Sequence, residues 1–180
     1  MAVLFYDNFH RADSASTGNG WTDDTSGTGT IASGIASNQQ FMTLNPAGEP
    51  VVYRTDLSES SGIIIRAEFS SADLTDGYYR VGILSPDGSA ATPGYAVVFD
   101  ANAGSVSLVD DSGTLASTSF TFNNTHKYAF EWDITPAPQN WSYLWVWDAT
   151  TGGEPTPATL TFNNGGVSFA PTTDGGSRFY

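Results

Sequence analysis

Residues 128–148 read YAFEWDITPAPQNWSYLWVWD, and the two short runs in this stretch decide the fold. In 128–134 large apolar residues alternate with alanine and acidic residues, which is typical of a strand that buries one face. In 141–147 both alternating sets are apolar. The prolines at 136 and 138 keep the connection out of any hydrogen-bond ladder. We therefore predict two neighbouring antiparallel strands.

The register of these two strands decides where the tryptophans point, because directly opposed residues share a face of the sheet. If Phe130 lies opposite Trp145, all the aromatic side chains point into the core. If Phe130 lies opposite Leu144 or Val146, the aromatic residues of 141–147 share the outer face with the acids of the first run. That second arrangement would form a platform for the apolar face and hydroxyls of a sugar ring.

Similar alternation recurs along the chain, with glycine and proline at the breaks. In 62–69 one set of alternate residues is apolar, and the other set contains Arg66 and Glu68. In 78–84, Tyr78 and Arg80 lie on the face opposite the apolar set. Many short strands at roughly ten-residue spacing predict an all-β antiparallel sandwich or jelly roll. The length of 180 residues predicts a single domain over 1–180.

Composition excludes several classes of function. The net charge is −13 and Lys127 is the only lysine, so direct binding to nucleic acid or to an anionic membrane is not expected. No cysteine is present to form disulfides or thiolate metal sites. The stretch MAVLFYDNFHR lacks the features of a signal peptide. A mature secreted protein and a virion component released by lysis both remain open.

Two stretches resemble a known family. HKYAFEWDITPAPQNWSYLWVWDATTG is similar to the paired strands "HxYxxxW … fyvDG" of concanavalin A-like lectin and glucanase domains. YDNFHRADSASTGNGWT resembles the opening of such domains in phage structural proteins and bacterial surface proteins, with His10 for the usual Asn and Ser14 for the usual Gly. The resemblance implies a concanavalin A-like jelly roll. It places Trp145 and Trp147 in the core, so we favour the register that pairs Phe130 with Trp145.

The resemblance also bears on catalysis. Glucanases of this fold carry three carboxylates on one strand, and Glu131 and Asp133 match the first two. Pro136 holds the third position, and without a third acid the double displacement has no proton donor. His10 and His126 belong to no convincing triad or metal motif. We predict that the chain is not an enzyme.

Two sets of residues are candidates for binding. Outward residues of neighbouring strands form the first set, in which Tyr78 could stack on a sugar while Arg66 and Arg80 bind hydroxyls or carboxylates. Trp141, at the start of the second aromatic run, joins this set of ligand-binding candidates.

The second set concerns metal. No cofactor is required, but acidic loops supply the oxygen ligands that calcium prefers. The resemblance implies a structural calcium between the first and last strands, with Asp7 and Asp174 as its nearest ligands. The acidic doublets at 110–111 and 23–24 are alternatives, although such doublets often only form turns.

These observations predict a non-catalytic structural protein of a virion surface, either a capsid decoration protein or a tail component that binds a receptor. Its partners would be a polysaccharide or other glycan, or other virion proteins, and it could form a homo-oligomer. The alternative is a secreted carbohydrate-binding module of a bacterial extracellular protein, and the third is a degenerate glucanase.

Overall fold

The computed structural model describes residues 6–24, 32–36, 39–43, 51–57, 63–70, 78–84, 93–110, 113–135, 141–153, 159–163 and 177–179. The strands in these ranges are β1 (Thr22–Asp24), β2 (Ala32–Ala36), β3 (Gln39–Thr43), β4 (Val51–Leu57), β5 (Ile63–Ser70), β6 (Tyr78–Leu84), β7 (Pro93–Asp100), β8 (Ser105–Asp110), β9 (Gly113–Ser119), β10 (Lys127–Thr135), β11 (Trp141–Asp148), β12 (Leu160–Asn163) and β13 (Ser177–Phe179). The described part of the chain is all-β, and it contains no helix that could cross a membrane.

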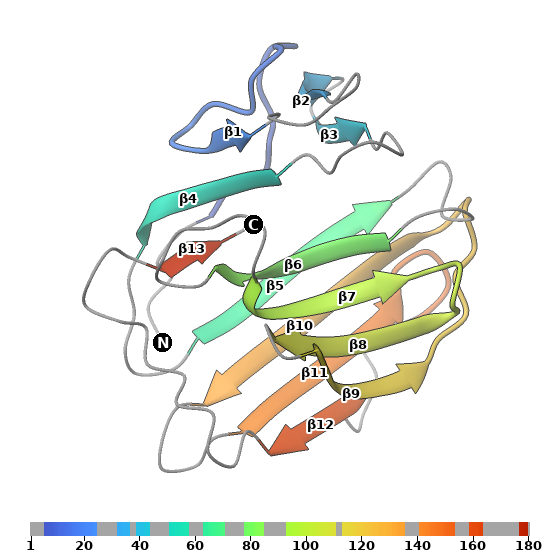
Figure 1. The fold of residues 1–180 in the computed structure, drawn as a ribbon. Coiled ribbons are helices and arrows are strands. Elements are labelled where there is room, and N and C mark those ends of the chain that lie inside the picture. Colours follow the sequence, from blue (N-terminus) through green and yellow to red (C-terminus); the bar gives the residue numbers. More distant parts are fainter. Residues whose placement is uncertain are drawn as a thin grey trace.

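The strands pair into two larger antiparallel sheets that lie face to face (Figure 1). One has seven strands in the order β1-β4-β13-β6-β7-β8-β9, and the other has four in the order β12-β11-β10-β5. β2 and β3 pair only with each other among the described strands. The prediction of an all-β antiparallel fold is confirmed for the described residues.

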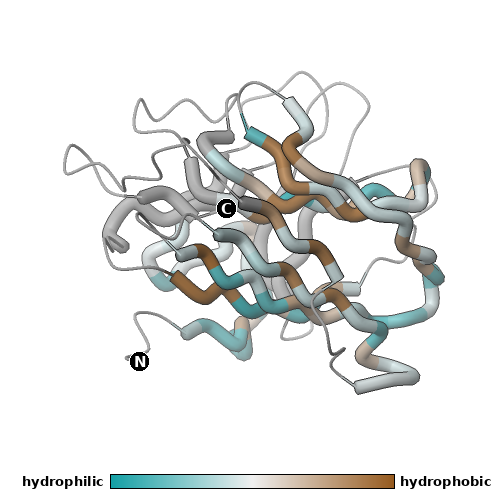
Figure 2. The backbone as a smooth tube through the Cα atoms, turned by 90° about the horizontal axis from the view of Figure 1, so that it is seen from below, coloured by the Kyte–Doolittle hydropathy of each residue, from teal (hydrophilic) through white to brown (hydrophobic). Residues whose placement is uncertain are grey.

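An aromatic core fills the space between the two sheets. Phe130 and Trp132 of β10 point inward and are 1% and 0% exposed. Their ring centroids lie 5.1 Å from Phe99 and 5.2 Å from Tyr95, both on β7 of the facing sheet. Such tilted ring pairs add about 0.5–1.5 kcal/mol each beyond the burial of area. Figure 2 shows the hydrophobic positions recurring along the strands of both layers, as the period-two pattern requires.

β5 follows the alternation predicted for it. Ile63 and Phe69 are buried, while Arg66 and Glu68 are exposed. The Phe69 ring stacks on Tyr79 of β6 across the sheet gap, with centroids 4.7 Å apart. Burial in this contact raises the pKa of Tyr79 to about 12. Ring contacts therefore join β5 and β10 of the four-stranded sheet to β6 and β7 of the seven-stranded sheet.

Gly82 marks a close approach between two neighbouring strands of the large sheet. It lies opposite Ala96 in the β6–β7 register. A Cβ atom at position 82 would lie 2.7 Å from both the Ala96 Cβ and the Tyr95 carbonyl oxygen. No side chain fits at that separation, so the pairing of β6 with β7 requires glycine here.

Candidate functional site

The register of β10 and β11 differs from the one that we favoured. Phe130 lies opposite Val146, and Glu131 lies opposite Trp145. The expected pairing of Phe130 with Trp145, which would have buried every aromatic residue of β11, is therefore wrong. The observed register is the alternative in which the aromatic residues of β11 share the outer face with Glu131 and Asp133.

Space between the sheets gives the physical reason. Facing sheets are only about 10 Å apart, and the rings of β10 and β7 already fill this gap. The inward residues of β11 are accordingly small or medium-sized: Ser142 and Leu144 are 0% exposed and Val146 is 3% exposed. The Tyr95 hydroxyl and Ser142 Oγ lie 2.7 Å apart in a buried hydrogen bond, which links β11 to the facing sheet. The larger side chains of β11 are left outside.

Three of those outward rings form a continuous row, which we call the aromatic stripe: Trp141, Tyr143 and Trp145. The centroids of Trp141 and Tyr143 are 5.9 Å apart, with ring planes 19° from parallel. Tyr143 and Trp145 are 6.0 Å apart, with planes at 30°. All three side chains are partly exposed. Trp147 continues along the same face, opposite Ala129.

Acidic side chains of β10 border the stripe. Asp133 lies opposite Tyr143, just as Glu131 lies opposite Trp145. On its other side β10 pairs with β5, where Arg66 lies opposite Glu131 and forms an ion pair with it. The outer face of the four-stranded sheet therefore places aromatic rings, carboxylates and a guanidinium in adjacent strands.

The two acids have different surroundings. Burial raises the pKa of Asp133, and the nearby charge of Glu131 raises it further. Arg66 bonds to Glu131 through both Nε and Nη2. Both acids can accept hydrogen bonds from hydroxyl groups, because a carboxylate has more acceptor positions than these contacts use.

Glu131 and Asp133 lie two residues apart on one face of β10, as the comparison with glucanases requires for the first two acids. Pro136, at the third position, lies outside the described residues. The ion pair with Arg66 commits Glu131 to a structural contact. The absence of catalysis stays a prediction.

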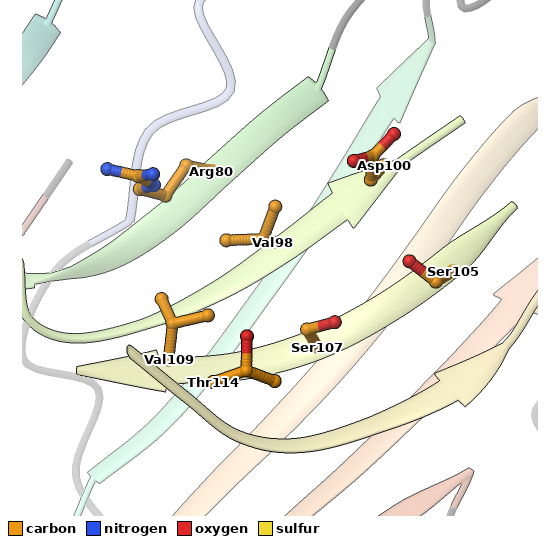
Figure 3. Close-up of a pocket in the computed structure, with 7 residues that line it drawn as sticks. All are labelled: Arg80, Val98, Asp100, Ser105, Ser107, Val109 and Thr114. Atoms are coloured by element: carbon orange, nitrogen blue, oxygen red, sulfur yellow. The ribbon is translucent and has the colours of Figure 1, made fainter. Parts of the chain in front are cut away.

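A second candidate surface lies on the outer face of the seven-stranded sheet. Figure 3 shows a shallow depression there, lined by Arg80, Val98, Asp100, Ser105, Ser107, Val109 and Thr114. The lining residues that the structure describes are aliphatic, polar or charged, so a sugar would bind to them mainly through hydrogen bonds. This surface is the weaker of the two for a sugar ring.

The ligand candidates chosen from the sequence are therefore divided between two faces. Tyr78 lies opposite Asp100 and Arg80 opposite Val98, both in the seven-stranded sheet. Arg66 lies in the four-stranded sheet, because β5 pairs with β10 and not with β6. The expectation that Arg66 and Glu68 lie on a strand next to Tyr78 and Arg80 is wrong.

Trp141 and Arg66 do share one outer face, so this part of the candidate set is brought together. Sequence analysis left Tyr143, Trp145, Glu131 and Asp133 out of the set. The signal that could have found them was the two-faced apolar pattern of 141–147, which forces one aromatic set outward when the other set is buried.

Asp7, one of the two expected calcium ligands, is the centre of a network of donors. Arg11 donates to both carboxylate oxygens, at 2.8 and 2.9 Å. The Phe9 amide, the Asn19 side chain and the Trp21 indole also donate to it. Burial alone would raise the pKa of Asp7, but these hydrogen bonds outweigh it and hold the pKa well below its ordinary value. The side chain of Asp7 is thus satisfied without a cation.

The other metal candidates are less well defined. Asp174 and Asp111 lie outside the described residues. Asp110 accepts a hydrogen bond from the Gly113 amide at 3.1 Å, which is the contact of a turn former. Asp23 and Asp24 lie in β1 and pair with Val52 and Val51 of β4. Among the residues that the structure describes, no group of three or more potential ligands could hold a metal ion.

His126 and Asp148, which belong to the motifs quoted above, pair at the end of the β10–β11 hairpin. His126 Nδ1 lies 2.5 Å from Asp148 Oδ2. Asp148 also accepts hydrogen bonds from the amides of Thr150 and Thr151, at 2.9 and 3.2 Å. Burial acts to raise the pKa of Asp148, but the His126 contact and the turn amides lower it to about 2. The pair therefore closes a turn. Sequence analysis did not predict that His126 and Asp148 contact each other.

No model of a known protein family matches the chain, and no curated protein matches its sequence. The resemblance to concanavalin A-like domains therefore stays a prediction.

Proposed function

We propose that this chain is a non-catalytic domain that binds polysaccharide on the outer face of its four-stranded sheet. One observation carries the proposal: β11 turns Trp141, Tyr143 and Trp145 outward in a row, and places Glu131 and Asp133 beside them. The C–H face of a pyranose ring packs on an aromatic ring, and its hydroxyls need acceptors at the edge of that ring. Rings and carboxylates in adjacent strands supply both.

A sugar suits this face better than a large protein interface does. Protein partners cover contiguous exposed apolar surface. Among the residues whose side-chain exposure the structure describes, the only exposed large hydrophobic side chain is Tyr6, at 75%, in the N-terminal segment. The rings of the aromatic stripe are partly exposed and are bordered by charged side chains, which fits a narrow polar ligand.

The setting of the domain follows from the sequence resemblance. We propose a concanavalin A-like jelly roll, a single domain over 1–180, in a structural protein of a virion surface. There the outer face of the four-stranded sheet would bind a host or environmental polysaccharide. Other virion proteins or further copies of the chain would be the neighbours of the domain. A secreted carbohydrate-binding module would use the same face. A degenerate glucanase would use it without turnover.

Affinity electrophoresis through gels that contain neutral or acidic polysaccharides, followed by calorimetric titration with oligosaccharides, tests the proposal. Trp145→Ala should weaken binding by about tenfold or more, equivalent to about 1.4 kcal/mol, without lowering the melting temperature greatly. Arg80→Ala tests the depression on the other sheet and should leave binding intact. Binding that survives Trp145→Ala and is lost in Arg80→Ala would assign the ligand to that other face. No binding to any polysaccharide would contradict the proposal.

A further inference from the structure

Arg66 and Glu131 form an asymmetric pair at the border of the aromatic stripe. The Arg66 side chain is 70% exposed, whereas that of Glu131 is only 12% exposed. Both Nε and Nη2 of the guanidinium contact the same oxygen, Oε2 of Glu131. An exposed cation is thus held by a shielded anion, directly opposite Trp145.

The second cation of this face is held in a similar way. Lys127 Nζ lies 3.2 Å from Glu68 Oε1, and both side chains are about half exposed. The described residues of the outer face therefore carry two cations, Arg66 and Lys127, and three carboxylates, Glu68, Glu131 and Asp133. Their formal sum is 2 − 3 = −1, on a chain whose net charge is −13.

We propose that the aromatic stripe binds neutral, linear polysaccharides, and that Glu131 excludes acidic ones by occupying the guanidinium of Arg66. The inference rests on the proposed function and adds the class of ligand. A guanidinium is the side chain best suited to bind a uronate or sulfate group, because its planar fork matches their oxygens. Here that fork already has a carboxylate partner from the protein.

An acidic sugar that binds the Nε–Nη2 fork of Arg66 would have to displace Glu131 from it. The displaced carboxylate would then be left shielded and without its cation, next to the further negative charge of Asp133. Leaving a shielded charge without its partner costs free energy, because the remaining charge is unsatisfied. Discrimination therefore arises from a contact that an acidic ligand must break.

A neutral sugar needs no such displacement. Its hydroxyls donate to the acceptor positions of Glu131 and Asp133 that remain free, while its ring packs on the stripe. The three rings follow the direction of β11 at intervals of 5.9 and 6.0 Å. A row with that spacing offers successive contacts to an extended chain of sugars, and we expect at least three adjacent units to contribute to affinity.

Calorimetric titration at low ionic strength tests this with matched ligands. The probes are hexamers of β-1,4-linked glucose, β-1,4-linked mannose and β-1,3-linked glucose, together with their C6-oxidised uronate forms. The wild-type chain should bind at least one neutral hexamer, and bind its uronate form about tenfold or more weakly, a difference of about 1.4 kcal/mol. Shortening the neutral ligand from three units to one should weaken binding strongly. Equal or tighter binding of the uronate would overturn the inference.

Glu131→Gln releases Arg66 and should strengthen uronate binding by about three- to tenfold, the effect of one charge-assisted contact. Glu68→Gln is the matched control, since it removes the same charge from the same face while leaving Arg66 paired. The gain in uronate affinity of Glu68→Gln should be clearly smaller than that of Glu131→Gln. Equal gains in both variants would mean that overall charge, and not the contact between Arg66 and Glu131, excludes acidic ligands.

The two proposals fail in different ways. If neutral and acidic hexamers bind alike and both lose affinity in Trp145→Ala, the binding function stands and the exclusion of acidic ligands is wrong. If no hexamer binds the wild-type chain or either variant, both proposals are overturned.

Discussion

Glu131 lies directly opposite Trp145 in the pairing of β10 with β11. This one relationship fixes the parity of the whole hairpin, because successive residues of a strand point to opposite faces. It directs Leu144 and Val146 inward and the aromatic stripe outward. A shift by one residue would have buried the stripe and exposed the aliphatic residues.

The parity predicts losses of stability of very different size for two tryptophans. Trp132→Ala removes a ring that is 0% exposed in the core, and should lower the free energy of unfolding by about 3–5 kcal/mol. Trp145→Ala removes a partly exposed ring and should cost about 1 kcal/mol or less. Chemical denaturation of both variants measures the difference. A larger cost for Trp145→Ala than for Trp132→Ala would contradict the register.

Gly82→Ala should destabilise the large sheet. The added methyl group would lie 2.7 Å from the Tyr95 carbonyl oxygen, so β6 and β7 must move apart. We expect a loss of about 1–3 kcal/mol, the usual cost of overpacking. Gly153→Ala is the matched control, because nothing lies within 4 Å of the atom that it adds. Equal melting temperatures for Gly82→Ala and Gly153→Ala would argue against this close approach.

Asp7 should make stability depend on pH in a defined direction. Its pKa is depressed in the folded state, so its contribution is fully present above the unfolded pKa of about 4 and is lost as the pH falls below that value. At pH 7 the wild type should be about 2 kcal/mol more stable than Asp7→Asn, by the usual linkage for a salt-bridged aspartate. Urea titrations at several pH values should show this gap closing in acid. A gap that is independent of pH would show that the carboxylate charge is not what stabilises this segment.

The pair of His126 and Asp148 should be visible by carboxyl NMR. Asp148 should titrate at about 2 in the wild type, and its pKa should rise toward 3.8 in His126→Ala, because that variant removes the main hydrogen bond that lowers it. Asp133 is an internal control in the same spectra, since burial and Glu131 raise its pKa independently of His126. An unchanged midpoint for Asp148 would mean that the turn amides alone set its pKa.

Alternation of residues was enough to predict which face of several strands is buried. In β5 and β10 the apolar set and the polar set are distinct, so Phe69, Phe130 and Trp132 could be assigned to the core from spacing alone. In β11 the same rule could not decide, because both sets are apolar. The volume available between the sheets made that decision, and this volume depends on residues of β7 that are distant in sequence.

Pairing between strands was harder to predict than burial. β5 and β6 follow each other in the chain but belong to different sheets, whereas consecutive strands are neighbours in roughly two-thirds of cases. This is why Arg66 was expected beside Arg80. β9 has the small and polar sequence GTLASTS, whose weak strand propensity gave no signal for a strand. It forms a strand because it pairs with β8.

The indole N–H signals in a proton–nitrogen spectrum, recorded while a neutral hexasaccharide is added, test the central claim most directly. The chain has five tryptophans, of which two belong to the aromatic stripe. We predict that the signals of Trp141 and Trp145 shift in proportion to bound ligand, while those of Trp21 and Trp132 stay in place. Shifts confined to backbone amides of β6, β7 and β8, with both stripe indoles unmoved, would contradict the account.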